Sequence, residues 1–237
     1  MVACVVLFGG RGSRFKHSEP KQYFEILGKS LLVYCLESLR TIKHLTQLVI
    51  VCEPTERKRV QKMITKMTPS HKQPEIVFCD SGRERSDSVL NGLNACKATT
   101  KHVLIHDGAR AFCPPSLLNI ISENILKYDG GVVPALPLVD TIVKLSDEHK
   151  SKIYQSLSRD KLRRVQTPQA FEYSLILEAY LKGKESKLQA TDCSSYFLNL
   201  GHQVRVIDGS EENIKVTTPM DIEIAKHILK TRDVLKC

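Results

Sequence analysis

Residues 2–15 read Val2-Ala3-Cys4-Val5-Val6-Leu7-Phe8-Gly9-Gly10-Arg11-Gly12-Ser13-Arg14-Phe15. An apolar run that ends in glycines is typical of a strand buried on both faces and followed by a tight turn. The glycines let the backbone approach a ligand closely, and free N–H groups in such a turn bind phosphate oxygens. The spacing fits neither a Walker loop nor a dinucleotide fingerprint. With Arg14 and Lys21 adding positive charge, we favour a phosphate site over a plain turn.

The same alternation of strand and helix continues along the chain. Strands are expected over residues 2–8, 47–52, 75–79, 102–106, 131–136 and 203–207. Helices are expected after the cap Ser30, over 55–67 and 86–96, from Pro114-Pro115, and from Thr218 as N-cap with Pro219 and Asp221 behind it. This order predicts an α/β fold: one domain over residues 1–237 with a mainly parallel twisted sheet and helices on both faces.

Residues 138–165 interrupt this rhythm. A β-branched stretch, the polar stretch 146–152 and a second apolar stretch at 153–157 predict a two-stranded β-hairpin arm with a solvated tip. Because a lone hairpin is marginally stable in water, the arm should pack on something, and a partner subunit is one candidate.

Composition narrows the class of protein. No apolar run is long enough to cross a bilayer, and the start of the chain lacks signal-peptide features, so we expect a cytoplasmic protein without a membrane partner. The net charge is +9, but the basic residues are scattered and there is no Trp, which favours small polyphosphates over nucleic acid. The cysteines lack metal-knuckle spacing and are interpreted as reduced core thiols.

Two further segments carry candidate ligand groups. In residues 82–89, a glycine turn followed by Arg85 and Ser88 at a helix start suits an anion or the edge of a base, although ordinary capping by Ser86, with Asp87 near the helix start, explains these residues slightly better on their own. Asp107 follows the predicted strand 102–106 and is a candidate Mg²⁺ ligand. Arg110 suits a phosphate, but a salt bridge between Asp107 and Arg110 is the alternative. We interpret His106 as a core histidine.

The remaining motifs flank the arm or lie near the end of the chain. Asp140-Thr141, Ser158-Arg159 and Gln166-Thr167-Pro168-Gln169 are equally compatible with blunting an exposed strand edge. Thr191-Asp192 follows, and Lys215 is placed on a short predicted strand from which it reaches a phosphate.

Taken in order, these segments resemble the 2-C-methyl-D-erythritol 4-phosphate cytidylyltransferases of the non-mevalonate isoprenoid pathway. The resemblance covers nearly the whole chain and rests on the following segments: Gly10-x-Gly12-x-Arg14, Pro20-Lys21-Gln22-Tyr23, Gly82-x-x-Arg85-x-x-Ser88-Val89, His106-Asp107-x-Ala109-Arg110, Asp140-Thr141, Gln166-Thr167-Pro168-Gln169, Thr191-Asp192 and Asn213-Ile214-Lys215-Val216-Thr217.

The resemblance implies a Rossmann-like nucleotidyltransferase domain, CTP and a polyol phosphate as substrates, a divalent cation such as Mg²⁺ at Asp107, and a homodimer whose arm embraces the other subunit. It makes Arg14, Lys21 and Lys215 the catalytic residues. It assigns CTP to Gly9, Gly10, Gly12, Ser13, Gly82, Arg85, Ser88 and Asp107. It assigns the acceptor phosphate to Arg110, Thr141, Arg159, Thr167 and Thr191, with Thr141 and Arg159 contributed across the dimer.

Some positions depart from the family pattern, namely Phe8, Gly108, Ala111, Arg163 and Cys193. These departures leave the identity of the acceptor substrate more open than the cytidylyl-transfer chemistry. Two alternatives therefore stay open: a ribitol 5-phosphate cytidylyltransferase, which shares most of these motifs, and a catalytically silent nucleotide-binding homologue. The residues alone, without the resemblance, indicate a phosphate-binding α/β protein with Mg²⁺ and an arm that contacts a partner.

Overall fold

The first strand, β1 (Val2–Leu7), lies inside an eight-stranded sheet. The computed structural model describes residues 1–10, 15, 19–67, 73–147 and 151–234. The strand order is β10-β7-β11-β6-β1-β4-β5, with β12 pairing β7, and the other bounds are β4 (Leu45–Cys52), β5 (Glu75–Asp80), β6 (His102–Asp107), β7 (Gly131–Pro137), β10 (Arg163–Val165), β11 (Gln169–Glu172) and β12 (Val204–Asp208). The six predicted strands are all present.

The sheet is mainly parallel, as predicted. Strands β5, β4, β1 and β6 run parallel to one another, and β12 runs parallel to β7. The exceptions are β11, which runs antiparallel between β6 and β7, and β10, which pairs with β7 in the same way. Four parallel strands therefore end at one edge of the sheet, which is where open α/β sheets bind ligands.

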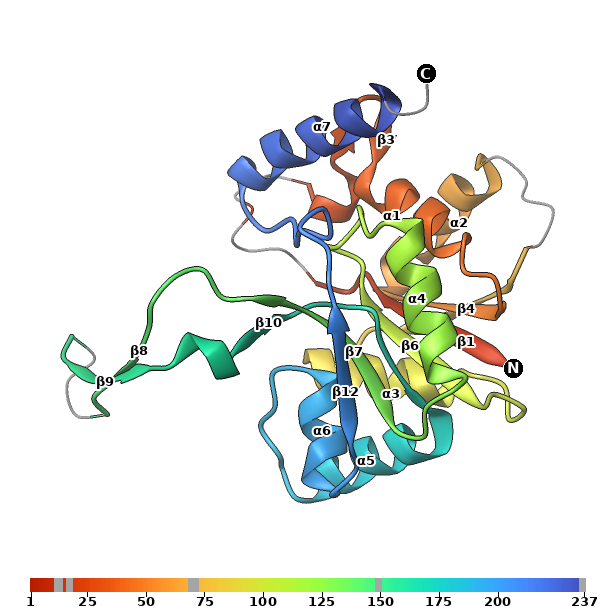
Figure 1. The fold of residues 1–237 in the computed structure, drawn as a ribbon. Helices are drawn as coiled ribbons and strands as arrows, with labels where there is room; N and C mark the ends of the chain where they lie inside the picture. The colour runs from red at the N-terminus through yellow and green to blue at the C-terminus, as the bar shows by residue number, and fades with distance from the viewer. Residues whose placement is uncertain (11–14, 16–18, 68–72, 148–150, 235–237) are drawn as a thin grey trace.

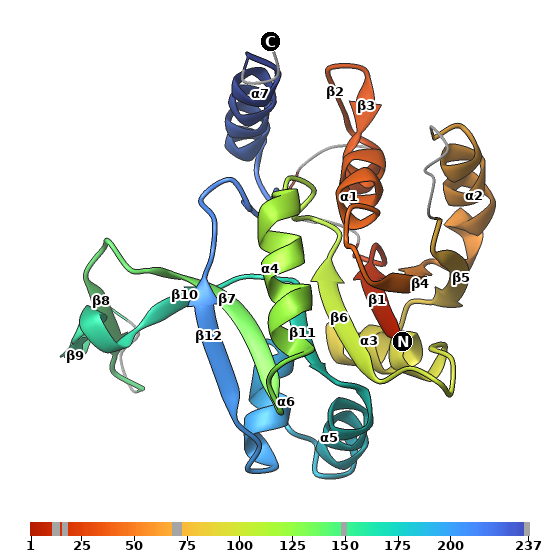
Figure 2. The same cartoon turned by 45° about the vertical axis from the view of Figure 1, so that its right-hand side comes forward.

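Helices cover both faces of the sheet (Figures 1 and 2). On one face the core includes residues of α1 (Leu31–Leu39), α2 (Arg57–Thr65), α4 (Pro115–Ile125) and α7 (Pro219–Val234). On the other it includes residues of α3 (Arg85–Asn94), α5 (Tyr173–Glu185) and α6 (Cys193–Asn199). Short 3₁₀ turns lie at Lys21–Tyr23, Pro54–Glu56 and Arg159–Lys161, and β2 (Glu25–Ile26) pairs with β3 (Lys29–Ser30).

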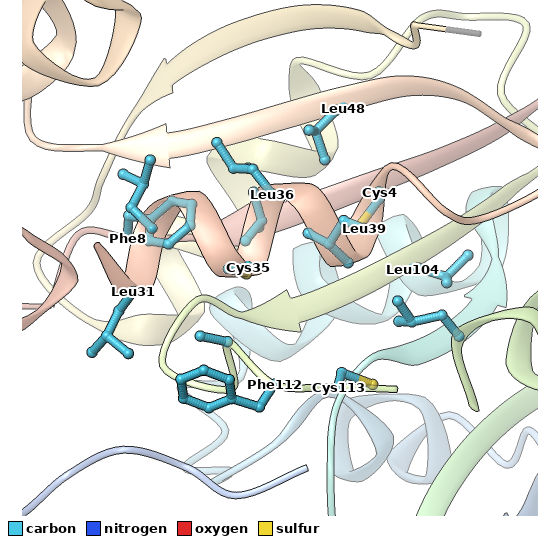
Figure 3. Close-up of a cluster of buried hydrophobic side chains, with 14 of the residues drawn as sticks. Cys4, Phe8, Leu31, Cys35, Leu36, Leu39, Leu48, Leu104, Phe112 and Cys113 are labelled. Atoms are coloured by element: carbon cyan, nitrogen blue, oxygen red, sulfur yellow. The ribbon is translucent and has the colours of Figure 1, made fainter. Parts of the chain in front are cut away.

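Alternation along β1 explains its continuous apolar sequence. Cys4 and Val6 face the α1 side, whereas Ala3 and Val5 face the α3 side, and all four are fully buried. Figure 3 shows Cys4 beside α1 with Cys35 and Cys113 in the same cluster. Among the described cysteines every thiol is free, and burial raises the pKa of Cys113 to about 12. These thiols pack as small apolar side chains, as predicted.

Three helix starts test the capping predictions. The Ser30 hydroxyl accepts from Val33 N at 3.3 Å, so the predicted cap of α1 is confirmed. Pro219 opens α7, and the Asp221 carboxylate accepts from Thr218 N at 2.7 Å. The cap predicted at Ser86 is wrong. Helix α3 begins one residue earlier, at Arg85, because Asp87 reaches back to accept from the backbone N–H of Glu84.

The predicted hairpin is present as β8 (Ile142–Leu145) and β9 (Ile153–Leu157), which form a separate two-stranded sheet. Both views show it projecting from the body of the molecule (Figures 1 and 2). Its apolar side chains are unusually open to solvent: Ile153 is 67% exposed and Tyr154 is 70% exposed. Elsewhere, none of the helices in the described ranges has the length and apolar character that crossing a membrane requires.

Candidate active site

Two adjoining cavities lie at the carboxyl ends of the parallel strands. The first has a volume of about 250 Å³, and the predicted residues that line it are Gly9, Gly10, Lys21, Gly82, Arg85, Ser88, Asp107 and Lys215. The second has a volume of about 420 Å³ and includes the predicted residues Arg110, Thr167 and Thr191. Arg85, Asp107 and Lys215 line both cavities. A group bound in one cavity therefore meets a group bound in the other at these three side chains.

Asp107, the last residue of β6, is held between two cations. Arg85 Nε donates to Asp107 Oδ1 at 3.0 Å, and Lys215 Nζ donates to Asp107 Oδ2 at 2.7 Å. Burial alone would raise the pKa of Asp107, but the charges of Arg85 and Lys215 outweigh it and hold this pKa well below its usual range. The carboxyl group is thus ionised at neutral pH, and the three groups together carry one net positive charge.

The salt bridge considered between Asp107 and Arg110 is not present. Arg110 instead donates from Nη1 to the carbonyl oxygen of Asn213 at 2.7 Å and from Nη2 to that of Val165 at 3.3 Å. The reason is topological, because the segment after Asp107 turns Arg110 toward the second cavity while Arg85 approaches Asp107 from the start of α3.

Lys215 lies in an extended segment before α7, outside the strands of the sheet, so the short strand predicted there is wrong. Apart from the local turn closed by Asn213 N and the carbonyl oxygen of Ser210, the described part of the chain gives this segment one backbone hydrogen bond, from Val216 N to the carbonyl oxygen of Ala109 at 2.9 Å, which is too little to form a ladder. Lys21 Nζ donates to the carbonyl oxygen of Val216 at 3.2 Å. Both lysines therefore reach the first cavity from the same side.

The Gly82 turn is tied to the start of α3 by Ser88. The Ser88 hydroxyl accepts from Gly82 N at 2.9 Å and donates to the carbonyl oxygen of Glu84 at 3.1 Å. These bonds fix the shape of the turn that lines the first cavity. Recognition of a base by Ser88 stays a prediction.

His106 is a satisfied core histidine, as predicted. Burial lowers its pKa to about 4, so the ring is neutral at physiological pH. Its Nδ1 lies 3.2 Å from the Thr167 hydroxyl, and its Nε2 lies 3.1 Å from the carbonyl oxygen of Arg110. Because a carbonyl oxygen can only accept, the ring proton sits on Nε2 and Nδ1 accepts from the Thr167 hydroxyl, which itself accepts from Asp107 N at 3.0 Å. Thr167 thus holds Asp107 in place.

Other predicted residues lie apart from this centre. Thr141 and Arg159 belong to the arm and its base and line neither cavity; Arg159 Nη1 donates to the carbonyl oxygen of Val139 at 2.6 Å. Arg163, one of the departures, donates to the carbonyl oxygens of Asp160 and Leu162. Gly12, Ser13 and Arg14 fall outside the described residues.

Sequence reasoning assigns no role to several residues of the second cavity, including Gln166, Gln169, Asp192, Ser194 and Ser195. The signal is present in part, because Gln166 and Gln169 flank Thr167 in a recognised motif. Ser194 and Ser195 carry no such signal, since they read as ordinary polar residues at a helix start.

The donor set fits one divalent cation that shares its ligands with a substrate. Asp107 offers a single ionised carboxylate, and no cluster of three or more acidic, histidine or cysteine side chains able to hold a metal occurs within the described ranges. Mg²⁺ is commonly bound by one or two carboxylates together with substrate phosphates, so it suits this arrangement better than an all-protein metal cage would.

Fold and cleft together define the class: an α/β nucleotidyltransferase, with basic side chains around an ionised aspartate at the carboxyl ends of the parallel strands. A family model for 2-C-methyl-D-erythritol 4-phosphate cytidylyltransferase matches residues 2–231. The chain belongs to this family, and it is accordingly a cytidylyltransferase.

Curated relatives agree with this assignment. The chain is 37% identical over 230 residues to the 2-C-methyl-D-erythritol 4-phosphate cytidylyltransferase of Alkaliphilus oremlandii, covering 96% of this chain and 94% of that one. It is 37% identical over 228 residues to the enzyme of the same name from Geobacillus kaustophilus, covering 96% of each.

Solved structures agree as well. The 4-diphosphocytidyl-2C-methyl-D-erythritol synthase of Anaerococcus prevotii superposes with a TM-score of 0.83 at 26% identity, covering 97% of this chain and 96% of that one. The 2-C-methyl-D-erythritol 4-phosphate cytidylyltransferase of Thermus thermophilus superposes with a TM-score of 0.73 at 26% identity, covering 95% and 98%.

Proposed function

We propose that the chain transfers the cytidylyl group of CTP to 2-C-methyl-D-erythritol 4-phosphate, giving 4-diphosphocytidyl-2-C-methyl-D-erythritol and diphosphate in the non-mevalonate route to isoprenoid precursors. The observation that carries this proposal is the meeting of two cavities at Arg85, Asp107 and Lys215. A transfer between two phosphate groups needs two adjoining sites with positive charge at their junction, and this cleft supplies both.

The chemistry requires no general base from the protein. An oxygen of the acceptor phosphate attacks the α-phosphorus of CTP, the bond from that phosphorus to the bridging oxygen of the β-phosphate breaks, and diphosphate leaves. A phosphate monoester is already ionised at neutral pH, so catalysis is positioning and charge stabilisation. We place CTP in the first cavity, where Lys21 and Lys215 offset the charge that builds up on the reacting phosphate. Arg14 is proposed to act with them.

The second cavity suits the acceptor. Arg110 and the exposed Thr191 line it, and Ser194 and Ser195 add hydroxyl groups able to contact a polyol. A planar guanidinium can bind a phosphate through two hydrogen bonds, which favours Arg110 as the contact to the acceptor phosphate. Thr167 has its hydroxyl committed to Asp107 and His106, which supports a role in shaping this cavity.

Members of this family depend on a divalent cation in general. We propose Mg²⁺, held by Asp107 together with phosphate oxygens. When bound, the ion neutralises phosphate charge and favours departure of diphosphate. Lys215 Nζ donates to Asp107 Oδ2, and phosphate oxygens offer this lysine an alternative partner. Nucleotide binding would therefore free a carboxylate oxygen for the cation.

We also propose a homodimer formed through the arm, residues 138–165. On the arm, Val139 before β8 and Ile153 and Tyr154 of β9 are each more than 60% exposed, which leaves an apolar surface that a second copy of the chain would cover. Thr141 and Arg159 lie on this arm and away from the cavities of their own chain, which supports their reaching the acceptor site of the partner subunit.

A transfer assay tests the proposed reaction. With CTP and Mg²⁺ we expect diphosphate release with 2-C-methyl-D-erythritol 4-phosphate and much slower release with ribitol 5-phosphate. Lys21→Ala and Lys215→Ala should each reduce turnover about a hundredfold. Lys97→Ala is the matched control, because Lys97 is as exposed as Lys215 and pairs with Glu75 at the other end of the sheet. Near wild-type turnover in both cleft variants, or preference for ribitol 5-phosphate, would contradict the proposal.

A further inference from the structure

The segment Gln166-Thr167-Pro168-Gln169 runs from the end of β10 to the first residue of β11, and Gln166, Thr167 and Gln169 line the acceptor cavity. The proposed function uses only Thr167 from it. The two glutamines are nonetheless almost completely buried: Gln166 is 5% exposed and Gln169 is 0% exposed. Burying a primary amide is costly unless its donors and acceptor are matched, so the partners of these side chains indicate what they hold in place.

Gln169 holds the start of α6. Its Nε2 donates to Asp192 Oδ2 at 2.9 Å, while its Oε1 accepts from the backbone N–H groups of Cys193 and Ser194, each at 3.1 Å. Asp192 also caps α6 by accepting from Ser195 N at 3.0 Å. Burial would raise the pKa of Asp192, but hydrogen bonds, including that from Gln169, keep it below its usual range and the group ionised. Thr191, on the wall of the acceptor cavity, directly precedes this clamp.

Gln166 holds a different segment, the turn before Lys215. Its Nε2 donates to the carbonyl oxygen of Ser210 at 2.8 Å, and its Oε1 accepts from Ser210 N at 3.1 Å. Oε1 also accepts from Asn213 Nδ2 at 3.3 Å, and Asn213 is two residues from Lys215. A Cβ atom on Gly209 would lie 2.5 Å from Gln166 Oε1, so an alanine at this position would displace the amide group of Gln166.

The two glutamines share no hydrogen-bond partner among the described residues. Between them, the Thr167 hydroxyl accepts from Asp107 N, so this one segment contacts three walls of the cleft. Resting on the proposed function, we propose that Gln166 and Gln169 are positioning residues with separable effects. Gln166 sets the position of Lys215 and therefore turnover. Gln169 sets the position of Thr191 and therefore the affinity for the acceptor.

Steady-state kinetics of two near-isosteric variants test the separation. We expect Gln169→Leu to raise the acceptor KM about tenfold or more, with kcat and the CTP KM within about threefold of wild type. We expect Gln166→Met to lower kcat about tenfold or more and to raise the acceptor KM less than Gln169→Leu does, since the Gln166 side chain is linked to the acceptor contact Arg110 only indirectly, through Asn213, to which Arg110 also donates. Each variant is the control for the other, because both remove one buried amide from the same segment.

Exchanging the amide of Gln169 and the carboxylate of Asp192, a reversed pair, should restore the affinity for the acceptor. Gln169→Glu keeps an acceptor for the two backbone N–H groups but sets its second oxygen against the Asp192 carboxylate, so it should raise the acceptor KM. Adding Asp192→Asn supplies an amide that donates to the introduced carboxylate, while its own oxygen still caps α6. The double variant Gln169→Glu/Asp192→Asn should return the acceptor KM to within about threefold of wild type. A separate variant tests the role of Gln166. Gly209→Ala displaces the Gln166 side chain without removing it and should reproduce the loss in kcat.

The outcomes separate the two proposals. A wild-type chain that transfers nothing overturns the proposed function. An active wild type in which Gln166→Met and Gln169→Leu change kcat and the acceptor KM in the same way overturns this inference, since both residues would then act only on general stability. So does a double variant no better than Gln169→Glu alone. If a leucine or methionine variant does not fold, the reversed pair and Gly209→Ala decide the question.

Discussion

The chemistry of the cleft depends on how Asp107 is held. Arg85 and Lys215 each occupy one of its oxygens, yet their bonds differ in permanence. The Arg85 side chain is 30% exposed and also donates to Cys193 Sγ at 3.5 Å, which anchors it at a second point. The Lys215 side chain is 42% exposed, and among the described residues its ammonium donates to Asp107 alone. Arg85 is therefore the fixed cation, and Lys215 is the one able to follow a phosphate.

His106 predicts a pH dependence of stability. Its pKa falls from an ordinary value of about 6.5 in the unfolded chain to about 4 in the folded one, so between these values the unfolded state binds more protons. The contribution of the neutral His106 ring to the free energy of unfolding is complete above about pH 6.5 and is lost as the pH falls toward 4. A pKa shift of this size corresponds to a change of at most about 3 kcal/mol in the free energy of unfolding. Denaturant unfolding across this range should show it.

The control is His106→Asn, which removes the titrating ring. Titration of Asp107 does not contribute to the difference between the two proteins, because its pKa lies well below the range from pH 4 to 6.5. The variant should be less stable at neutral pH and should lose less stability on acidification than the wild type. Parallel pH profiles for the two proteins would show that His106 does not titrate as the structure indicates.

Single residues also show what the sequence alone can predict. Local motifs identify Asp107 and Lys215, because each follows a recognisable pattern of neighbours. Their pairing cannot be predicted in this way: they are 108 positions apart, and the contact depends on the segment before α7 lying beside the end of β6, where Val216 N donates to the carbonyl oxygen of Ala109. The nearby Arg110 is the natural candidate by sequence, yet its backbone direction aims it elsewhere. Roles in contacts of this kind follow only from the folded chain.

Elements are predictable where their sequence pattern is strong. Strand β1 is a continuous apolar run and residues 48–52 of β4 form another, and α1 and α7 carry capping residues at their starts. Strands β10 and β11 escape prediction because they are three and four residues long, and β10 is exposed throughout. These two strands form because they pair with β7, and their own sequences carry no strand pattern.

The ends of β1 and β6 predict an energetic coupling between two departures from the family pattern. A Cβ atom on Gly108 would lie 2.4 Å from Cδ1 and Cε1 of Phe8 and 2.8 Å from the carbonyl oxygen of Leu7. Phe8 and Gly108 both line the first cavity. Gly108→Ala should therefore push the Phe8 ring toward the bound nucleotide and raise the Kd for CTP, which calorimetric titration measures.

A double-mutant cycle isolates the pair. Phe8→Ala removes the ring that the new methyl group would meet, so in Phe8→Ala/Gly108→Ala the second substitution should cost at least about 1 kcal/mol less than it does in the wild type. Rescue should be partial, because the Leu7 carbonyl oxygen remains close. Strict additivity of the two effects would mean that the departures are independent.

The whole molecule combines a body whose sheet is covered by helices with an arm whose apolar side chains are open to solvent. The sheet is covered by helices on both faces, whereas Ile153 and Tyr154 of the arm have no such cover within the described ranges. The proposed homodimer would cover these exposed side chains. It would also place Thr141 and Arg159 where a single chain cannot use them, since they line neither of its cavities.

Mixing two inactive variants tests this arrangement. If Arg159 serves the partner's site, a dimer of one Lys215→Ala chain and one Arg159→Ala chain has one damaged site and one intact site. Random pairing after mixing equal amounts and allowing exchange should then recover about a quarter of wild-type activity. If Arg159 serves its own chain, every site carries a defect and mixing recovers nothing. A monomeric wild type in sedimentation analysis would contradict the dimer itself. Ile153→Asp, which charges the exposed arm, should weaken the dimer and lower activity together, because separation removes Arg159 from the site that it serves.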